Sequence, residues 1–188
     1  MVEEHIIGIS GDVFLQKNEE KKIDNRVRLA KEFVKFNERC FVMLLGDMRA
    51  YNFVIAITQD FDNVQYRIRA MDFDQQCYEG RKNIYLPQFF KDNIQLVQLA
   101  QEVMSIETAE QYMNEERSAM RKRFQASLFE AKSLLRVMEK DRISSDENVD
   151  RLKTELAEFY GNDQFLKCRT MGEILILNIE NRLQIEIF

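Results

Sequence analysis

Two short segments decide what this chain can form: Leu44-Leu45-Gly46-Asp47-Met48-Arg49-Ala50-Tyr51-Asn52-Phe53, and Met71-Asp72-Phe73-Asp74. The apolar run 41–45 predicts a short buried strand that leads into a loop at Asp47. Asn52 follows five residues later and opens a second apolar strand, and a third strand ends on Asp72. The pattern thus places an Asp, an Asn and a second Asp at the ends of neighbouring elements.

The second and third strands are predicted to form a hairpin. Residues 53–58 and 64–71 are rich in β-branched and aromatic side chains, and the polar residues 59–63 between them are typical of a turn. Antiparallel pairing brings the outer ends of the two strands together. We therefore expect Asn52 and Asp72 to lie close enough to share one cation, with Asp60 and Asp62 at the opposite end as turn formers.

Asp, then Asn five residues on, then Asp at a strand end is the arrangement that phosphoryl transfer to a hydroxyl uses. One carboxylate orients the acceptor hydroxyl, and the amide and the second carboxylate hold Mg²⁺ on the phosphates. Asp47 is the only Asp of the chain that is followed by Asn at plus five.

Over residues 41–74 the chain resembles the C-terminal lobe of the protein-kinase-like superfamily, especially its aminoglycoside phosphotransferase branch. The resemblance implies a site that uses Mg²⁺ and ATP. Asp47 is then the catalytic residue that deprotonates the acceptor, and Arg49 offsets the charge that develops on the phosphate. Asn52 and Asp72 are the implied metal ligands, and Asp74 is the ligand of a second metal.

Two departures from the family pattern qualify this resemblance. Leu45 stands where the family usually has a His that braces the loop, and only 46 residues precede Asp47. A kinase N-terminal lobe, with its Gly-rich cover and strand Lys, does not fit into that length. We therefore expect either an inactive or truncated relative, or a chain that relies on a protein partner or on a missing N-terminal lobe.

Other classes of protein remain open. Asp72 and Asp74 also resemble the nucleophile and acid of haloacid-dehalogenase-like phosphatases, and metal-dependent glycosyltransferases share an Asp-x-Asp pair. The main alternative is a non-catalytic helical interaction or scaffold protein, whose helices after residue 93 dock a partner or a second copy of the chain. Phosphate-transfer assays on Asp47→Asn and Asp72→Asn variants distinguish an enzyme from a scaffold.

The composition of the chain limits the partners and the cellular compartment that we expect for it. The 188 residues are 45% hydrophobic and carry a net charge of −5, which argues against broad binding to nucleic acid or to an anionic membrane. Three widely spaced Cys residues and the lack of a secretory signal predict a reducing, cytoplasmic setting. His5 is the only histidine, so neither a His-rich zinc site nor a catalytic pair of Ser or Cys with His is expected.

The rest of the chain has helical periodicity. Apolar residues recur at three- and four-residue steps in three segments. They predict a helix that Asp24 can cap and that runs to about residue 37, a buried helix over 93–104, and a long helix that Ser105 or Thr108 caps and that reaches about residue 140. Capping boxes at Ser144 and Thr170 predict two further helices, the first of them ended by Gly161. We expect a single α+β domain that is mostly helical, with a small antiparallel sheet in its first half: a kinase C-lobe-like core over 1–104 and a helical part over 105–188.

Overall fold

The structure is a computed structural model, and it describes residues 8–19, 23–60 and 63–188. It is mostly helical and contains a three-stranded antiparallel sheet in its first half, as the sequence predicts. The N-terminal part contains β1 (Ile9–Ser10), α1 (Gly11–Glu19), α2 (Arg26–Met43), η1 (Ala50–Asn52), β2 (Phe53–Asp60), β3 (Asn63–Ala70), η2 (Lys82–Tyr85), η3 (Pro87–Phe89), η4 (Lys91–Asn93) and α3 (Ile94–Val103). The C-terminal part contains α4 (Ile106–Ala126), α5 (Leu128–Lys140), α6 (Asp146–Tyr160), η5 (Asp163–Lys167) and α7 (Met171–Leu183).

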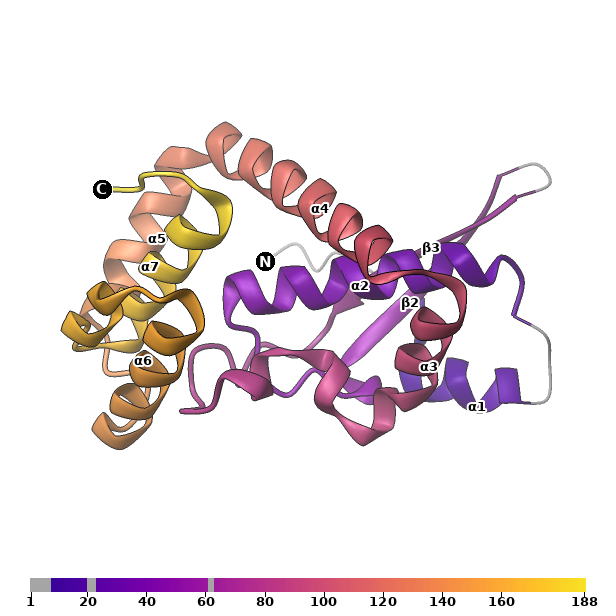
Figure 1. The fold of residues 1–188 in the computed structure, drawn as a ribbon, viewed down its shortest axis with the longest axis horizontal. Coiled ribbons are helices and arrows are strands. Elements are labelled where there is room, and N and C mark those ends of the chain that lie inside the picture. The colour runs from indigo at the N-terminus through magenta and orange to yellow at the C-terminus, as the bar shows by residue number, and fades with distance from the viewer. Residues whose placement is uncertain (1–7, 20–22, 61–62) are drawn as a thin grey trace.

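The sheet has the order β1-β2-β3, and β2 and β3 form the predicted hairpin (Figure 1). Its register pairs Phe53 with Ala70 and Ile55 with Ile68, so the apolar side chains of the two strands share one face. That face is buried against α2 and α3, whereas Arg67 and Arg69 point to the exposed side. The centre of the predicted turn, like His5, lies outside the described residues.

Helix α2 organises the molecule because it contributes to both hydrophobic clusters. Leu29, Phe33 and Phe36 pack with the hairpin and α3, whereas Phe41 and Val42 pack with the C-terminal helices. Helix α4 extends from the sheet side to the group formed by α5, α6 and α7 (Figure 1). The fully buried side chains of one helix therefore connect the two parts of the chain.

A buried ion pair cluster also connects these parts. Glu38 of α2 is only 2% exposed and accepts hydrogen bonds from Arg117 of α4 and Arg182 of α7, with the closest N–O distance 2.7 Å in each case. A carboxylate buried to this degree is tolerated only when it is paired and hydrogen-bonded. Glu38 thus fixes the relative positions of three helices from distant parts of the sequence.

The predicted strand over residues 41–45 is wrong. Residues 41–43 form the last turn of α2, which extends beyond its predicted end at residue 37, and Leu44 is its C-cap. The side chain of Asn25 caps the helix by accepting from the amide of Arg28, whereas Asp24 was the predicted cap. A short apolar run does not distinguish a buried strand from a buried helix end, and here Phe41 and Val42 are buried as part of the helix.

Two further predictions need correction in the C-terminal half. The long helix predicted from Ser105 or Thr108 to about residue 140 is capped by Ser105, but it is divided at Ser127 into α4 and α5. Helix α6 is capped by Ser145, whose hydroxyl accepts from the Asn148 amide, one residue after the predicted cap. The cap at Thr170 and the C-cap at Gly161 are confirmed.

Candidate functional site

The loop that follows α2 contains the predicted catalytic Asp. Leu44 adopts a left-handed conformation that ends the helix, and its carbonyl accepts a hydrogen bond from the amide of Cys77 at 2.9 Å. A Cβ at Gly46 would lie 2.6 Å from the carbonyl oxygen of Gln75. Only glycine therefore permits the segment after Asp74 to pack this closely against the loop.

Asp47, Arg49 and Asn52 converge within this loop. The Arg49 Nε donates to Asp47 Oδ1 at 2.8 Å, and the Asn52 amide nitrogen donates to the Asp47 carbonyl oxygen at 2.7 Å. Asp47 itself has a left-handed backbone with φ of 51°, which turns its carbonyl toward the amides of the same loop. Hydrogen bonds among three residues that the sequence analysis predicted as site residues thus close the loop.

The Arg49 side chain connects this loop to the segment around residue 90. Its Nη1 lies 3.2 Å from Asp92 Oδ2, and its guanidinium lies 5.2 Å from the centre of the Phe90 ring. The hydrogen bond with Asp47 raises the pKa of Arg49 further above its ordinary value, so this side chain stays charged throughout the usual pH range. Arg49 is therefore a permanent cation beside the Asp47 carboxylate.

The hairpin brings Asn52 next to the segment that contains Asp72. The amide of Met71 donates to the Asn52 carbonyl at 3.0 Å, which places Asp72 one residue beyond the paired position. Asp72 Oδ1 accepts from the amide of Asp74 at 3.1 Å, and both carboxylates are exposed. Asp74 meets Asp72 through its backbone amide, and among the described residues its carboxylate forms no hydrogen bond or ion pair with the Asp47 loop.

Among residues 8–19, 23–60 and 63–188, no group of three or more His, Cys, Asp and Glu side chains is arranged to hold a metal ion. A cation at this place would instead take one amide oxygen from Asn52, one carboxylate from Asp72, and its other ligands from a bound nucleotide. The metal-ligand roles of Asn52, Asp72 and Asp74 stay predictions.

Asn93 is a positioning residue that the sequence did not single out. Its fully buried side chain donates to the carbonyl oxygens of Met48 and Pro87, at 2.9 and 2.8 Å. It thereby fastens the Asp47 loop to the polar segment before α3. Asp92, the second partner of Arg49, was also missed. No local motif indicates either residue, because their partners in the Asp47 loop, Met48 and Arg49, lie more than forty positions away along the chain.

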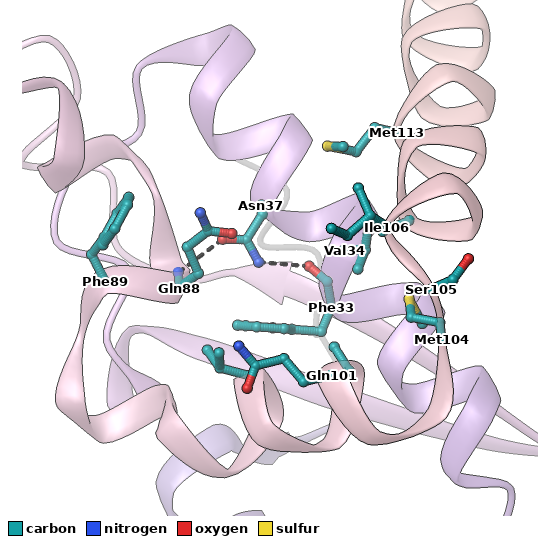
Figure 2. A pocket seen from close by; sticks show the side chains of 13 residues that line it. Phe33, Val34, Asn37, Gln88, Phe89, Gln101, Met104, Ser105, Ile106 and Met113 are labelled. Carbon is teal, nitrogen blue, oxygen red and sulfur yellow. Dashed lines mark hydrogen bonds between the residues drawn. The ribbon is translucent and has the colours of Figure 1, made fainter.

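A second candidate site is an apolar groove of about 390 Å³ between α2, α3 and α4 (Figure 2). Its walls include Phe33, Val97, Met104, Ile106 and Met113. The polar side chain of Asn37 is already bonded within it: it donates to the Phe33 carbonyl and accepts from the Gln88 amide. The groove is the kind of apolar surface that the interaction hypothesis requires, and that hypothesis stays a prediction.

Comparison with known proteins does not add a family: no family model, no curated protein and no solved structure matches this chain. No helix in the described part of the chain combines the length and the apolar character needed to cross a membrane.

Proposed function

We propose that this chain is a kinase-like phosphotransferase lobe that binds Mg²⁺ and a nucleotide beside the Asp47 loop and transfers a phosphoryl group to a hydroxyl. The observation that carries the proposal is the bond from the Asn52 amide to the Asp47 carbonyl. A carbonyl oxygen only accepts hydrogen bonds, so the atom of Asn52 that faces it is the nitrogen.

That bond engages the nitrogen of the Asn52 amide and not its oxygen. None of the described residues donates a hydrogen bond to that oxygen. An amide oxygen is a hard ligand suited to Mg²⁺, and Asp72 follows the residue that is paired with Asn52. These two groups, contributed by the two ends of the hairpin, would hold the cation and through it the phosphates.

Asp47 and Arg49 supply the remaining chemistry. The proton of the acceptor hydroxyl passes to the Asp47 carboxylate as the hydroxyl oxygen bonds to the γ-phosphorus. The bond from that phosphorus to the bridging oxygen breaks, and the nucleoside diphosphate leaves. The permanent charge of Arg49 stabilises the negative charge on the transferred group. Mg²⁺, held by Asn52 and Asp72, would supply further positive charge to the phosphate oxygens.

A protein partner or a further lobe is required to cover the nucleotide in this proposal. The phosphate ligands described above come from one side of the nucleotide only. The partner completes the site, and this chain contributes the acceptor-side carboxylate and the metal ligands.

Binding of Mn²⁺ and ATP to the full chain, measured by isothermal titration calorimetry, tests the proposal. We expect the wild-type chain to bind Mn²⁺ more tightly when ATP is present, and Asp72→Asn to weaken that binding roughly tenfold or more. Asp163→Asn is the matched control, since it removes an exposed carboxylate from the C-terminal part. Equal binding by the Asp72→Asn and Asp163→Asn variants would contradict the proposal and favour a non-catalytic interaction protein.

A further inference from the structure

A polar cavity shares one residue, Phe90, with the surroundings of Arg49 described above. It has a volume of about 500 Å³ and is bounded by Arg81, Asn83, Phe90, Arg151 and Glu155. Its walls come from both parts of the chain: the segment before α3 supplies one side, and α6 supplies the other. A cavity of this size accommodates a small molecule.

The segment that supplies one wall is fixed firmly on α6. A Cβ at Gly80 would lie 2.8 Å from the Cα of Asn148, so the two backbones are in close contact there. The amide of Lys82 donates to Glu155 Oε2 at 2.7 Å, and the Lys82 ammonium lies 4.4 Å from the centre of the Phe159 ring. The cavity is therefore formed by two rigidly joined elements.

Positive charge dominates this cavity. The side chains of Arg81 and Arg151 approach it from positions seventy residues apart, and neither has a hydrogen bond or ion pair with any described residue. Glu155 is the only carboxylate in the lining, and one of its oxygens already accepts from a backbone amide. Two guanidinium groups without a protein counter-charge are suited to bind a carboxylate or a phosphate.

The cavity is also connected to the predicted catalytic group. Phe90 forms part of its wall, and the Arg49 guanidinium lies over the Phe90 ring while its Nε donates to Asp47. Phe90 and Arg49 thus form a chain of contacts from the cavity wall to the Asp47 carboxylate. In the proposal below, a molecule bound in the cavity would extend past these two side chains toward Asp47.

We propose that this cavity binds the anionic group of a small acceptor substrate, so that the phosphotransferase acts on a hydroxyl compound that carries a carboxylate or phosphate. The role of the bound anion as an acceptor substrate rests on the proposed function. The anion site itself rests on the cavity and its two arginines. Arg81 and Arg151 hold the anionic group, and Asp47 receives the proton of the hydroxyl.

Binding of glycerol 3-phosphate and of glycerate to the full chain, without nucleotide or metal, tests the anion site directly. Glycerol serves as the uncharged analogue. We expect the wild-type chain to bind at least one of the two anions but not glycerol, and Arg151→Gln and Arg81→Gln each to weaken binding roughly tenfold. Arg142→Gln is the matched control, because it removes an exposed arginine whose partner is Asp146, away from this cavity.

Three outcomes would overturn the proposal: no binding of either anion by the wild-type chain, equal weakening in Arg142→Gln, or displacement of the anion by ATP. The last result would mean that the two arginines bind the nucleotide. Retention of anion binding in Asp72→Asn, which lacks the proposed metal ligand, supports a separate acceptor site. If the chain binds the anion but does not bind Mn²⁺ and ATP, the anion site stands. The acceptor role and the proposed function are then both contradicted.

Discussion

Individual side chains in the Asp47 loop act mainly on the loop itself. Gly46 allows the Gln75 carbonyl to approach, Asn52 closes the loop on the Asp47 carbonyl, and Asn93 fastens Met48 to the following segment. The Asn52 bond is made within the loop, whereas the contacts of Gly46 and Asn93 join the loop to segments that are distant in the sequence. The conformation of the loop therefore depends on these individual contacts more than on the backbone propensities of its residues.

The bond donated by Asn52 can be tested by two substitutions. Asn52→Ala removes the donor and is expected to lower the free energy of unfolding by about 1 kcal/mol. Asn52→Asp is expected to lower it further, because a carboxylate would face the Asp47 carbonyl and lie near the Asp47 carboxylate, whose Oδ2 is 3.4 Å from the amide nitrogen.

Urea unfolding of the three proteins, followed by circular dichroism, measures these differences. Asn178→Ala is not a suitable control because that residue is buried in another hydrogen-bond network. Gln125→Ala, at an exposed position of α4, serves instead. An Asn52→Asp variant as stable as the wild type would show that the amide does not donate to the loop.

At the scale of elements, close helix packing depends on the smallest residue. Gly172 lies in the first turn of α7, where a Cβ would overlap the carbonyl of Met138 near the end of α5. The Thr170 side chain adds to this contact, since its hydroxyl donates to the Glu139 carbonyl and accepts from the amide of Glu173. The end of α5 and the start of α7 are therefore joined backbone to backbone.

Gly172→Ala is expected to destabilise the protein by about 1–3 kcal/mol, because the added methyl has no room against backbone atoms that do not rotate away. An exposed helical position would gain stability from the same change. Thermal unfolding of Gly172→Ala beside Ser133→Ala, on an exposed part of α5, separates the two effects. An unchanged melting temperature for Gly172→Ala would contradict the close packing of α5 and α7.

At the scale of the whole molecule, burial affects how stability depends on pH. Desolvation raises the pKa of the Cys77 thiol from 9.0 to about 12 and that of Cys168 to about 11. Burial also raises the pKa of Tyr85 above its ordinary value. All three groups stay neutral in the folded protein at a pH where the unfolded chain already ionises.

The sign of the effect follows from these shifts. Because the folded pKa values lie above the unfolded ones, their contribution to stability is complete below pH 9 and is lost as the pH rises toward 11 to 12. Each such group lowers the free energy of unfolding by about 1.4 kcal/mol per pH unit over that interval. Urea unfolding at pH 8 and pH 10.5 measures the loss.

Cys77→Ala should reduce this pH dependence, because it removes one ionisable thiol. The stability lost because the smaller side chain packs less well is the same at both pH values. We expect the variant to be less stable than the wild type at pH 8 and to approach it at pH 10.5. Parallel curves for the two proteins would show that Cys77 ionises as readily in the folded state as in the unfolded one.

The sequence by itself determined the elements whose signals are local. The hairpin followed from alternation and turn residues, and the caps at Thr170 and Gly161 followed from side chains that bond within one turn. The convergence of Asp47, Arg49 and Asn52 is also local, because the three residues lie within six positions.

Tertiary structure alone decided the rest. Residues 41–43 are helical because Phe41 and Val42 are buried against helices that lie far along the chain, and no local pattern predicts that burial. Asp92 and Asn93 reach the Asp47 loop through contacts across more than forty positions, and Arg81 and Arg151, seventy positions apart, line the same cavity. Such contacts depend on how whole elements pack against one another, and the free energy of that packing cannot be predicted from any short segment of the sequence.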